Sequence, residues 1–172
     1  RHDFFEPRLD WEIRGNGNLT EPDWPFDGEL NDYISATDNG SGSSDIWYFR
    51  APEYFYGDAS AYFGLSINVI MRRSASATEL LFYPDIILKG AGMTLTSTWY
   101  TRGAYPIGTD WTNVIMSLQI DSESGQWLKD GNPATSADLQ SVLADLEELW
   151  IRGEHTSGGS SDLDRVILFG SN

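Results

Sequence analysis

Groups that catalyse reactions are few and poorly arranged in this chain. Only two histidines occur, His2 near one end and His155 between Glu154 and Thr156, and neither adjoins a G-x-S-x-G nucleophile motif. Nucleophilic catalysis by Ser or Thr needs an activating base beside the hydroxyl. A glycosidase needs two carboxylates facing across a cleft. With 26 acidic residues in the chain, some pair of carboxylates will always be close together, so such a pair does not distinguish a glycosidase from a protein without activity. The sequence therefore predicts that the protein is not an enzyme.

The acidic surplus gives a formal net charge of −15 and limits the possible partners. A nucleic-acid-binding protein neutralises phosphates with Lys and Arg, and only 11 such residues are spread thinly along this chain. The charge thus argues against nucleic acid and against anionic membranes. Three interpretations of the acidic residues stay open, namely solubility, attraction of basic partners, and oxygen ligands for a hard cation such as Ca²⁺.

Aromatic side chains are the other candidate binding groups. Sugar-binding sandwiches stack the C–H-rich face of a sugar on Trp or Tyr, while nearby polar groups bind the hydroxyls. Trp127 and Tyr105 are the lead platform candidates because each lies in a connection punctuated by Gly or Pro, and the alternative for every such residue is ordinary core packing. The aromatic residues in or beside loops are Trp24, Tyr54, Tyr56, Tyr100, Tyr105 and Trp127.

Length and composition predict one domain spanning residues 1–172. A chain of this size buries about 70 % of its unfolded surface in a single core, and seven Trp, eight Tyr and eight Phe supply large apolar areas. No cysteine is present, so there is neither a disulfide framework nor a thiolate metal site. The longest apolar runs are too short to insert into a membrane. Because Arg1 is not a starting Met, we expect a processed or excised part of a larger multidomain chain.

Hydrophobic alternation predicts an all-β fold. The clearest strands are 47–49, 65–71, 93–100, 114–120 and 163–169, each with apolar side chains at every second position or an aromatic run. Only one segment has helical periodicity, a leucine stripe that predicts an amphipathic helix over about 137–150 with Ser136 as its cap. Many short strands, frequent turns and a single helix favour an antiparallel β-sandwich, specifically a jelly roll.

Several segments, in order, resemble the laminin B domain, also called laminin IV. An aromatic strand runs into Ala51-Pro52 and closes on Gly57-Asp58, and residues 85–92 are similar to the family's D-V-x-L-x-G-x-G strand and turn. Trp127 before a helix is similar to the family's tryptophan-then-helix segment, and residues 163–168 are similar to its closing L-D-x-V-x-L. The resemblance covers about residues 24–170. The missing cysteines and an opening strand that resembles a carbohydrate-binding module point to a stand-alone or bacterial relative.

These resemblances carry expectations about metal and ligand. Carbohydrate-binding modules that open with F-E and close with D-x-V-x-L carry Ca²⁺ ligands at those places, which implies Glu6 and Asp164, with Asp38 as a third candidate. The alternative is that Glu6 is a solvated rim residue and Asp164 binds a turn backbone. By the same resemblance, a carbohydrate ligand would stack on Trp127 and Tyr105, with Trp24 and Tyr100 as further candidates.

The laminin B resemblance implies a non-catalytic binding or adhesion module that acts outside the cell or at its surface, with a glycan or an extracellular protein as partner. Two alternatives stay open, namely a structural spacer domain of a larger secreted protein and a polysaccharide-degrading enzyme. Exposed loop aromatics would separate a binding module from a spacer, and convergent carboxylates in a groove would indicate an enzyme.

Overall fold

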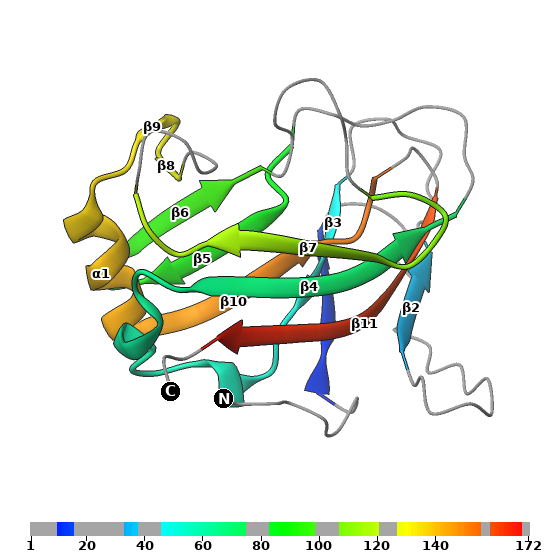
Figure 1. Cartoon of the computed structure of the whole chain (residues 1–172), viewed down its shortest axis with the longest axis horizontal. Coiled ribbons are helices and arrows are strands. Elements are labelled where there is room, and N and C mark those ends of the chain that lie inside the picture. Colours follow the sequence, from blue (N-terminus) through cyan, green and yellow to red (C-terminus); the bar gives the residue numbers. More distant parts are fainter. Residues whose placement is uncertain are drawn as a thin grey trace.

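The chain folds into two antiparallel sheets packed face to face, with one α-helix at one end of the sandwich (Figure 1). This is the jelly-roll β-sandwich that the alternation predicts. The computed structural model describes residues 10–15, 33–37, 46–74, 83–98, 107–120, 127–155 and 159–169. The expected first strand near Phe4 lies outside these residues.

The larger sheet has seven strands in the order β1-β3-β10-β5-β6-β8-β9. Strand β10 is an inner strand of this sheet, with β3 on one side and β5 on the other, so both of its edges are hydrogen-bonded. The strands of this sheet are β1 (Glu12–Gly15), β3 (Trp47–Arg50), β5 (Ile86–Gly90), β6 (Met93–Ser97), β8 (Leu128–Lys129), β9 (Asn132–Pro133) and β10 (Leu146–Arg152).

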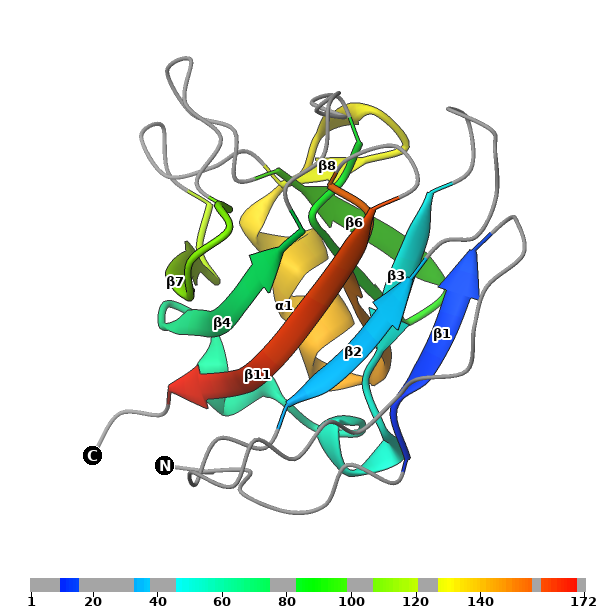
Figure 2. The ribbon, with the colours of Figure 1, turned by 90° about the vertical axis from the view of Figure 1, so that its right-hand side faces the viewer.

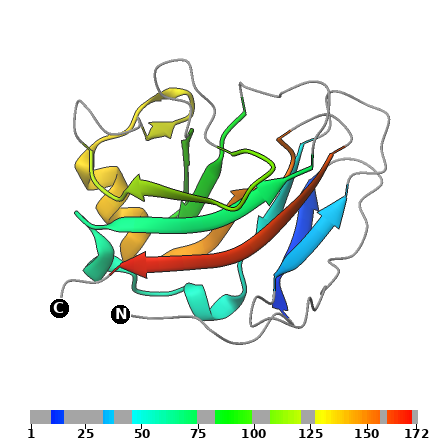
Figure 3. The same ribbon diagram turned by 45° about the vertical axis from the view of Figure 1, so that its right-hand side comes forward.

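The smaller sheet has four strands in the order β2-β11-β4-β7, which can be followed across the face in Figure 2. Its members are β2 (Ile34–Thr37), β4 (Ser66–Arg73), β7 (Thr112–Ser117) and β11 (Ser160–Phe169). The long strands β4 and β11 curve together along the sandwich (Figure 3). Their pairing is interrupted by a register shift between Leu163 and Arg165, so that Asp164 is an extra, bulged residue.

The core is formed by the inward-facing residues of both sheets, as period-two alternation requires. Trp47 and Phe49 of β3 are buried and contact each other edge to face, with ring centroids 5.0 Å apart. In β7, Val114 and Met116 are buried, whereas Ile115 between them is exposed. The alternation predicted for β7 is therefore confirmed, whereas all three aromatic residues of β3, Tyr48 included, are buried.

The helical prediction is correct for only part of its length. Helix α1 (Ser136–Ala144) buries Leu139, Val142 and Leu143, but residues 146–150 belong to strand β10. Leu146 and Leu149 continue the helical spacing. In β10 both are nevertheless buried, because a register shift between Leu146 and Glu148 brings these two positions onto the same face of the strand. Hydrogen bonding to β3 and β5 decides the outcome.

The start of α1 also differs from the prediction. Thr135, rather than Ser136, is the N-cap, and its hydroxyl accepts a hydrogen bond from the backbone N–H of Asp138 while the Asp138 carboxylate accepts one from Thr135 N. Hydrogen bonds from Lys129 and Thr135 hold the pKa of Asp138 well below its usual value. No helix among the described residues is long and apolar enough to cross a membrane.

Gly90 allows α1 to pack closely on β5. A Cβ at this position would lie 2.1 Å from the carbonyl oxygen of Asp145 and 2.8 Å from that of Val142. Both obstacles are backbone atoms at the end of the helix, so no side-chain rotation relieves the clash. Gly90, in the segment 85–92 that resembles the family's strand and turn, therefore has a packing role. Because it lacks a Cβ, the end of the helix can lie directly on the sheet.

We expect Gly90→Ala to lower the free energy of unfolding by about 3 kcal/mol, because the helix end must move away from β5. Gly108→Ala is the matched control, since the nearest atom to a Cβ at Gly108 is 3.9 Å away. Urea unfolding of both variants tests this, and equal stability of the two variants would contradict it.

Candidate binding face

One row of polar side chains crosses the outer face of the four-stranded sheet. Asp162 of β11 pairs with Ser35 of β2 on one side and with Arg72 of β4 on the other. The neighbouring residues Met71 and Leu163 are buried in the core, so the side chains of the row point outward.

Hydrogen bonds fix this row in place. Arg72 Nε donates to Asp162 Oδ2 at 2.7 Å, and Ser35 Oγ donates to Asp162 Oδ1, also at 2.7 Å. Partial burial by itself lowers the pKa of Arg72, but the hydrogen bond and charge of Asp162 outweigh it, and the net shift is upward. Each carboxylate oxygen of Asp162 thus accepts one hydrogen bond that fixes its position, and each keeps a lone pair for a further donor.

Two aromatic rings complete the row. The guanidinium carbon of Arg72 lies 4.4 Å from the ring centroid of Trp111 and 5.1 Å from that of Tyr33. The two rings meet edge to face with centroids 5.4 Å apart, and Trp111 remains 37 % exposed. We call these five residues (Tyr33, Ser35, Arg72, Trp111 and Asp162) the Arg72 cluster.

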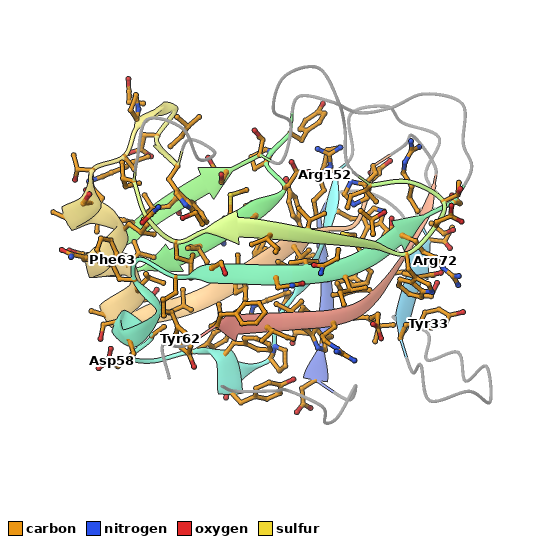
Figure 4. The ribbon with its side chains drawn as sticks, in the orientation of Figure 1. Tyr33, Asp58, Tyr62, Phe63, Arg72 and Arg152 are labelled. Atoms are coloured by element: carbon orange, nitrogen blue, oxygen red, sulfur yellow. The ribbon has the colours of Figure 1, made fainter. Side chains whose placement is uncertain are left out.

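The Arg72 cluster is confined to one end of the sheet. Figure 4 shows Tyr33 and Arg72 together there, whereas Asp58, Tyr62 and Phe63 lie at the other end of β4. The stacked guanidinium holds the Trp111 indole in place, so this exposed ring is a fixed surface rather than a mobile one. Such a surface loses little conformational entropy when a flat, apolar ligand face stacks on it.

Trp127 does not act as a stacking platform. The side chain is 2 % exposed, and its Nε1 donates a hydrogen bond of 2.9 Å to the carbonyl oxygen of Ser117 in β7. The glycine near Trp127 in the sequence gave no information about the direction of the ring, which points into the core. The other predicted platforms, Trp24, Tyr100 and Tyr105, lie outside the described residues.

Asp164 is the one predicted metal ligand whose position the structure describes. It is the bulged residue of β11 and is half-buried, and its burial raises the pKa of the carboxyl while the charge of Arg165 opposes the shift. Glu6 and Asp38 lie outside the described residues. Within the described ranges, no three His, Cys, Asp or Glu side chains are grouped to hold a metal ion.

Sequence analysis missed all five members of the Arg72 cluster. The position of Trp111 could have been predicted from the alternation of β7. Trp111 lies two residues before Asn113 and four before Ile115, which both point outward. The pairing of Arg72 with Asp162 left no signal in the sequence, because these residues are ninety positions apart and meet only through the register of β11.

The outer face of the seven-stranded sheet also carries a tryptophan, but that ring is covered. Lys89 Nζ lies 3.8 Å from the ring centroid of Trp150, and Tyr48 packs 5.7 Å away. Lys89 also pairs with Glu148 at 2.6 Å, which holds the lysine over the ring. Trp111 is therefore the better candidate for contact with a ligand.

A buried polar cluster lies where β10 ends. Arg152 is fully buried, with its Nη1 3.3 Å from Asp85 Oδ1 and its Nε donating to the Glu154 carbonyl oxygen at 2.7 Å. His155 is also buried, and burial, aided by the charges of Arg152 and Arg73, holds its pKa well below 6.5. His155 is therefore neutral in the folded protein at neutral pH.

We expect this histidine to make the fold acid-sensitive. The unfolded chain binds a proton at His155 near pH 6.5 and the folded chain does not, so its stabilising contribution is complete above that pH and falls as the pH decreases. Between pH 7 and 5.5 the wild type should lose about 1 kcal/mol more than His155→Gln. Urea unfolding across this range is the test, and parallel pH profiles for the two proteins would contradict it.

The fold and the outward-facing row define a jelly-roll β-sandwich module. The chain belongs to the laminin B (domain IV) family, whose model matches residues 48–170. Domains of this family are non-enzymatic modules, generally of extracellular proteins. The family resemblance found in the sequence is thus confirmed. No curated protein matches the chain.

Solved structures with the same fold include both laminin and carbohydrate-binding domains. The L4b domain of human laminin alpha-2 is 16 % identical with a TM-score of 0.68, over 88 % of this chain and 85 % of that domain. The family 11 carbohydrate-binding module of the Clostridium thermocellum cellulase Lic26A-Cel5E is 14 % identical with a TM-score of 0.61, over 99 % and 93 %. A solution structure of CtCBM11 is 15 % identical with a TM-score of 0.59, over 99 % and 94 %. At these identities the similarity establishes the fold.

Proposed function

We propose that this domain is a non-catalytic binding module of an extracellular or cell-surface protein, and that it binds carbohydrate on the Arg72 cluster. The observation that carries the proposal is the exposed Trp111 indole, held in place by Arg72 beside hydroxyl and carboxylate groups. A sugar ring has an apolar C–H face for the indole and hydroxyls for Ser35 and Asp162. The carbohydrate-binding modules among the structural neighbours support this choice of ligand.

Binding at one such site is expected to be weak. A single stacked ring with a few exposed hydrogen bonds leaves little free energy beyond the cost of association. Useful affinity would then come from several modules in one larger chain or assembly that engage the same polysaccharide. This expectation suits a domain that holds proteins to a matrix rather than one that captures a free sugar.

Trp111→Ala should weaken retention on polysaccharide at least about tenfold, because the stacking surface is removed. Affinity electrophoresis against a panel of plant, bacterial and animal polysaccharides measures this, beside a thermal melt. Tyr54→Ala is the matched control, since Tyr54 is similarly exposed, at 39 %, but lies in the 3-10 helix η2 (Glu53–Phe55) away from the cluster. Unchanged retention of Trp111→Ala would reject the cluster as the platform, and reproducible depolymerisation would overturn the non-enzymatic assignment.

We also propose one structural Ca²⁺, with Asp164, Glu6 and Asp38 as its side-chain ligands. The half-buried Asp164 carboxyl supports this, because burial disfavours its charged form and a bound cation would stabilise it. An ion that binds only the folded state raises the melting temperature with its concentration. We expect calcium to raise the melting temperature of the wild type and of Asp130→Asn, an exposed-turn control, but not of Asp164→Asn. Identical melts with EDTA and with calcium would remove the proposal.

A further inference from the structure

The outer face of the four-stranded sheet continues beyond the Arg72 cluster along β4. Successive outward residues of a strand are about 6.7 Å apart, so the face extends roughly 20 Å from Arg72 to Ser66. The pairing of β4 with β11 and β7 places Ile70 beside Arg165 and Asn113, Asn68 beside Ile167 and Ile115, and Ser66 beside Phe169 and Ser117.

Asn68 is the unusual member of this face. Its flanking residues Ile67 and Val69 point into the core, so the Asn68 side chain points outward, yet it is only 7 % exposed. The amide oxygen Oδ1 is buried and has no hydrogen-bond donor among the residues that the structure describes. A buried acceptor without a donor is destabilising, so the fold gains nothing from an amide at this position.

The surroundings of Asn68 are apolar and partly open. Ile167 and Ile115 lie on either side of it, and Ile115 is 62 % exposed. One row further along, Phe169 is 38 % exposed. In order along β4 the face therefore carries a fixed indole, the Ile70 row with Arg165 and Asn113, an aliphatic patch around the buried acceptor of Asn68, and a second aromatic ring.

We propose that this face binds an internal stretch of a linear, uncharged polysaccharide, with one sugar stacked on Trp111 and a hydroxyl several sugars further along donating to Oδ1 of Asn68 once the amide turns from its buried position toward the ligand. The inference rests on the carbohydrate-binding function proposed above and adds a second subsite to it. A polyhydroxylated chain fits because it carries apolar ring faces for Ile115 and Phe169 and a neutral donor for the amide.

Charge favours an uncharged chain over an acidic one. The protein carries a net charge of −15, which repels polyanions. Two arginines lie on this part of the face. Arg72 is already neutralised by Asp162 at 2.7 Å, and Arg165 lies close enough to Asp164 for its charge to lower the pKa of that carboxyl. The Arg72 cluster, which binds the first sugar, therefore offers no strong site for a carboxylate or a sulfate group.

Chain-length dependence tests the second subsite. Isothermal titration calorimetry would compare the disaccharide and the hexasaccharide of β-1,4-linked glucose, mannose and xylose. We expect a hexasaccharide to bind the wild type at least about tenfold more tightly than its disaccharide, because only the longer chain reaches from Trp111 to Asn68.

Asn68→Leu is the informative variant, because leucine is similar in size and removes the buried acceptor without leaving another polar group unpaired. It should melt no lower than the wild type, bind the disaccharide equally well and lose most of the hexasaccharide gain. Asn132→Leu, an exposed change in β9, is the matched control and should bind both sugars as the wild type does.

The outcomes separate the two proposals. Equal affinity for disaccharide and hexasaccharide, or an unchanged hexasaccharide affinity in Asn68→Leu, overturns the second subsite while the Trp111 site stands. Binding of no member of this sugar panel overturns the second subsite, whereas the Trp111 site is overturned only if Trp111→Ala leaves retention on the wider polysaccharide panel unchanged. A concentration-dependent dimer in analytical ultracentrifugation that Ile115→Asp abolishes would instead assign this face to self-association and overturn the inference.

Discussion

The buried pair of Arg152 and Asp85 is the interaction on which the sandwich depends most. Arg152 is the last residue of β10, an inner strand of the seven-stranded sheet, and Asp85 immediately precedes β5. Removing one partner of a buried ion pair costs about 3–5 kcal/mol, because the remaining charge has lost its counter-charge away from water. The pair therefore fixes where β10 ends against β5. Since β10 also carries the chain from the end of α1 to this pair, one ionic contact and the close approach at Gly90 anchor the strand at its two ends.

The candidate binding face follows from this anchored core. Once both sheets bury one face against the other, period-two alternation leaves the remaining side chains of β2, β4 and β11 on the outside. The inner residues Met71 and Leu163 thereby direct their neighbours Arg72 and Asp162 outward, where the two form an ion pair under the aromatic rings. The face is thus a consequence of core packing. Its rigidity comes from a regular sheet, whereas a loop would have to be ordered when ligand binds.

The sequence predicted the parts of this structure that depend on local patterns. Alternation in 65–71 and 114–120 identified strands, and the motif order identified the family. Local pattern failed at residue 145, because the spacing of Leu146 and Leu149 is helical. The two share a strand face only through the register shift between Leu146 and Glu148, which arises when β10 pairs with β5. Local pattern failed again at Trp127, because a position in the chain does not determine the direction of a side chain. The Arg72 cluster could not be predicted, since it is made by residues of three strands and by Tyr33 and Trp111, each of which immediately precedes a strand, and these meet only in the folded sheet.

The bulge at Asp164 explains why that cluster exists at all. From Arg165 to Phe169, β11 pairs with β4 in one continuous register. If that register continued without the extra residue, Leu163 would lie opposite Arg72 and point outward, and Asp162 would point into the core. The bulge reverses the phase of the strand, so that Leu163 is buried and Asp162 reaches Arg72. The same extra residue leaves the Asp164 carboxyl half-buried beside the sheet. The proposed cation ligand and the ion pair of the proposed glycan site therefore originate in a single irregularity of one strand, and any ion that holds this bulge in place would also maintain the register that builds the binding face.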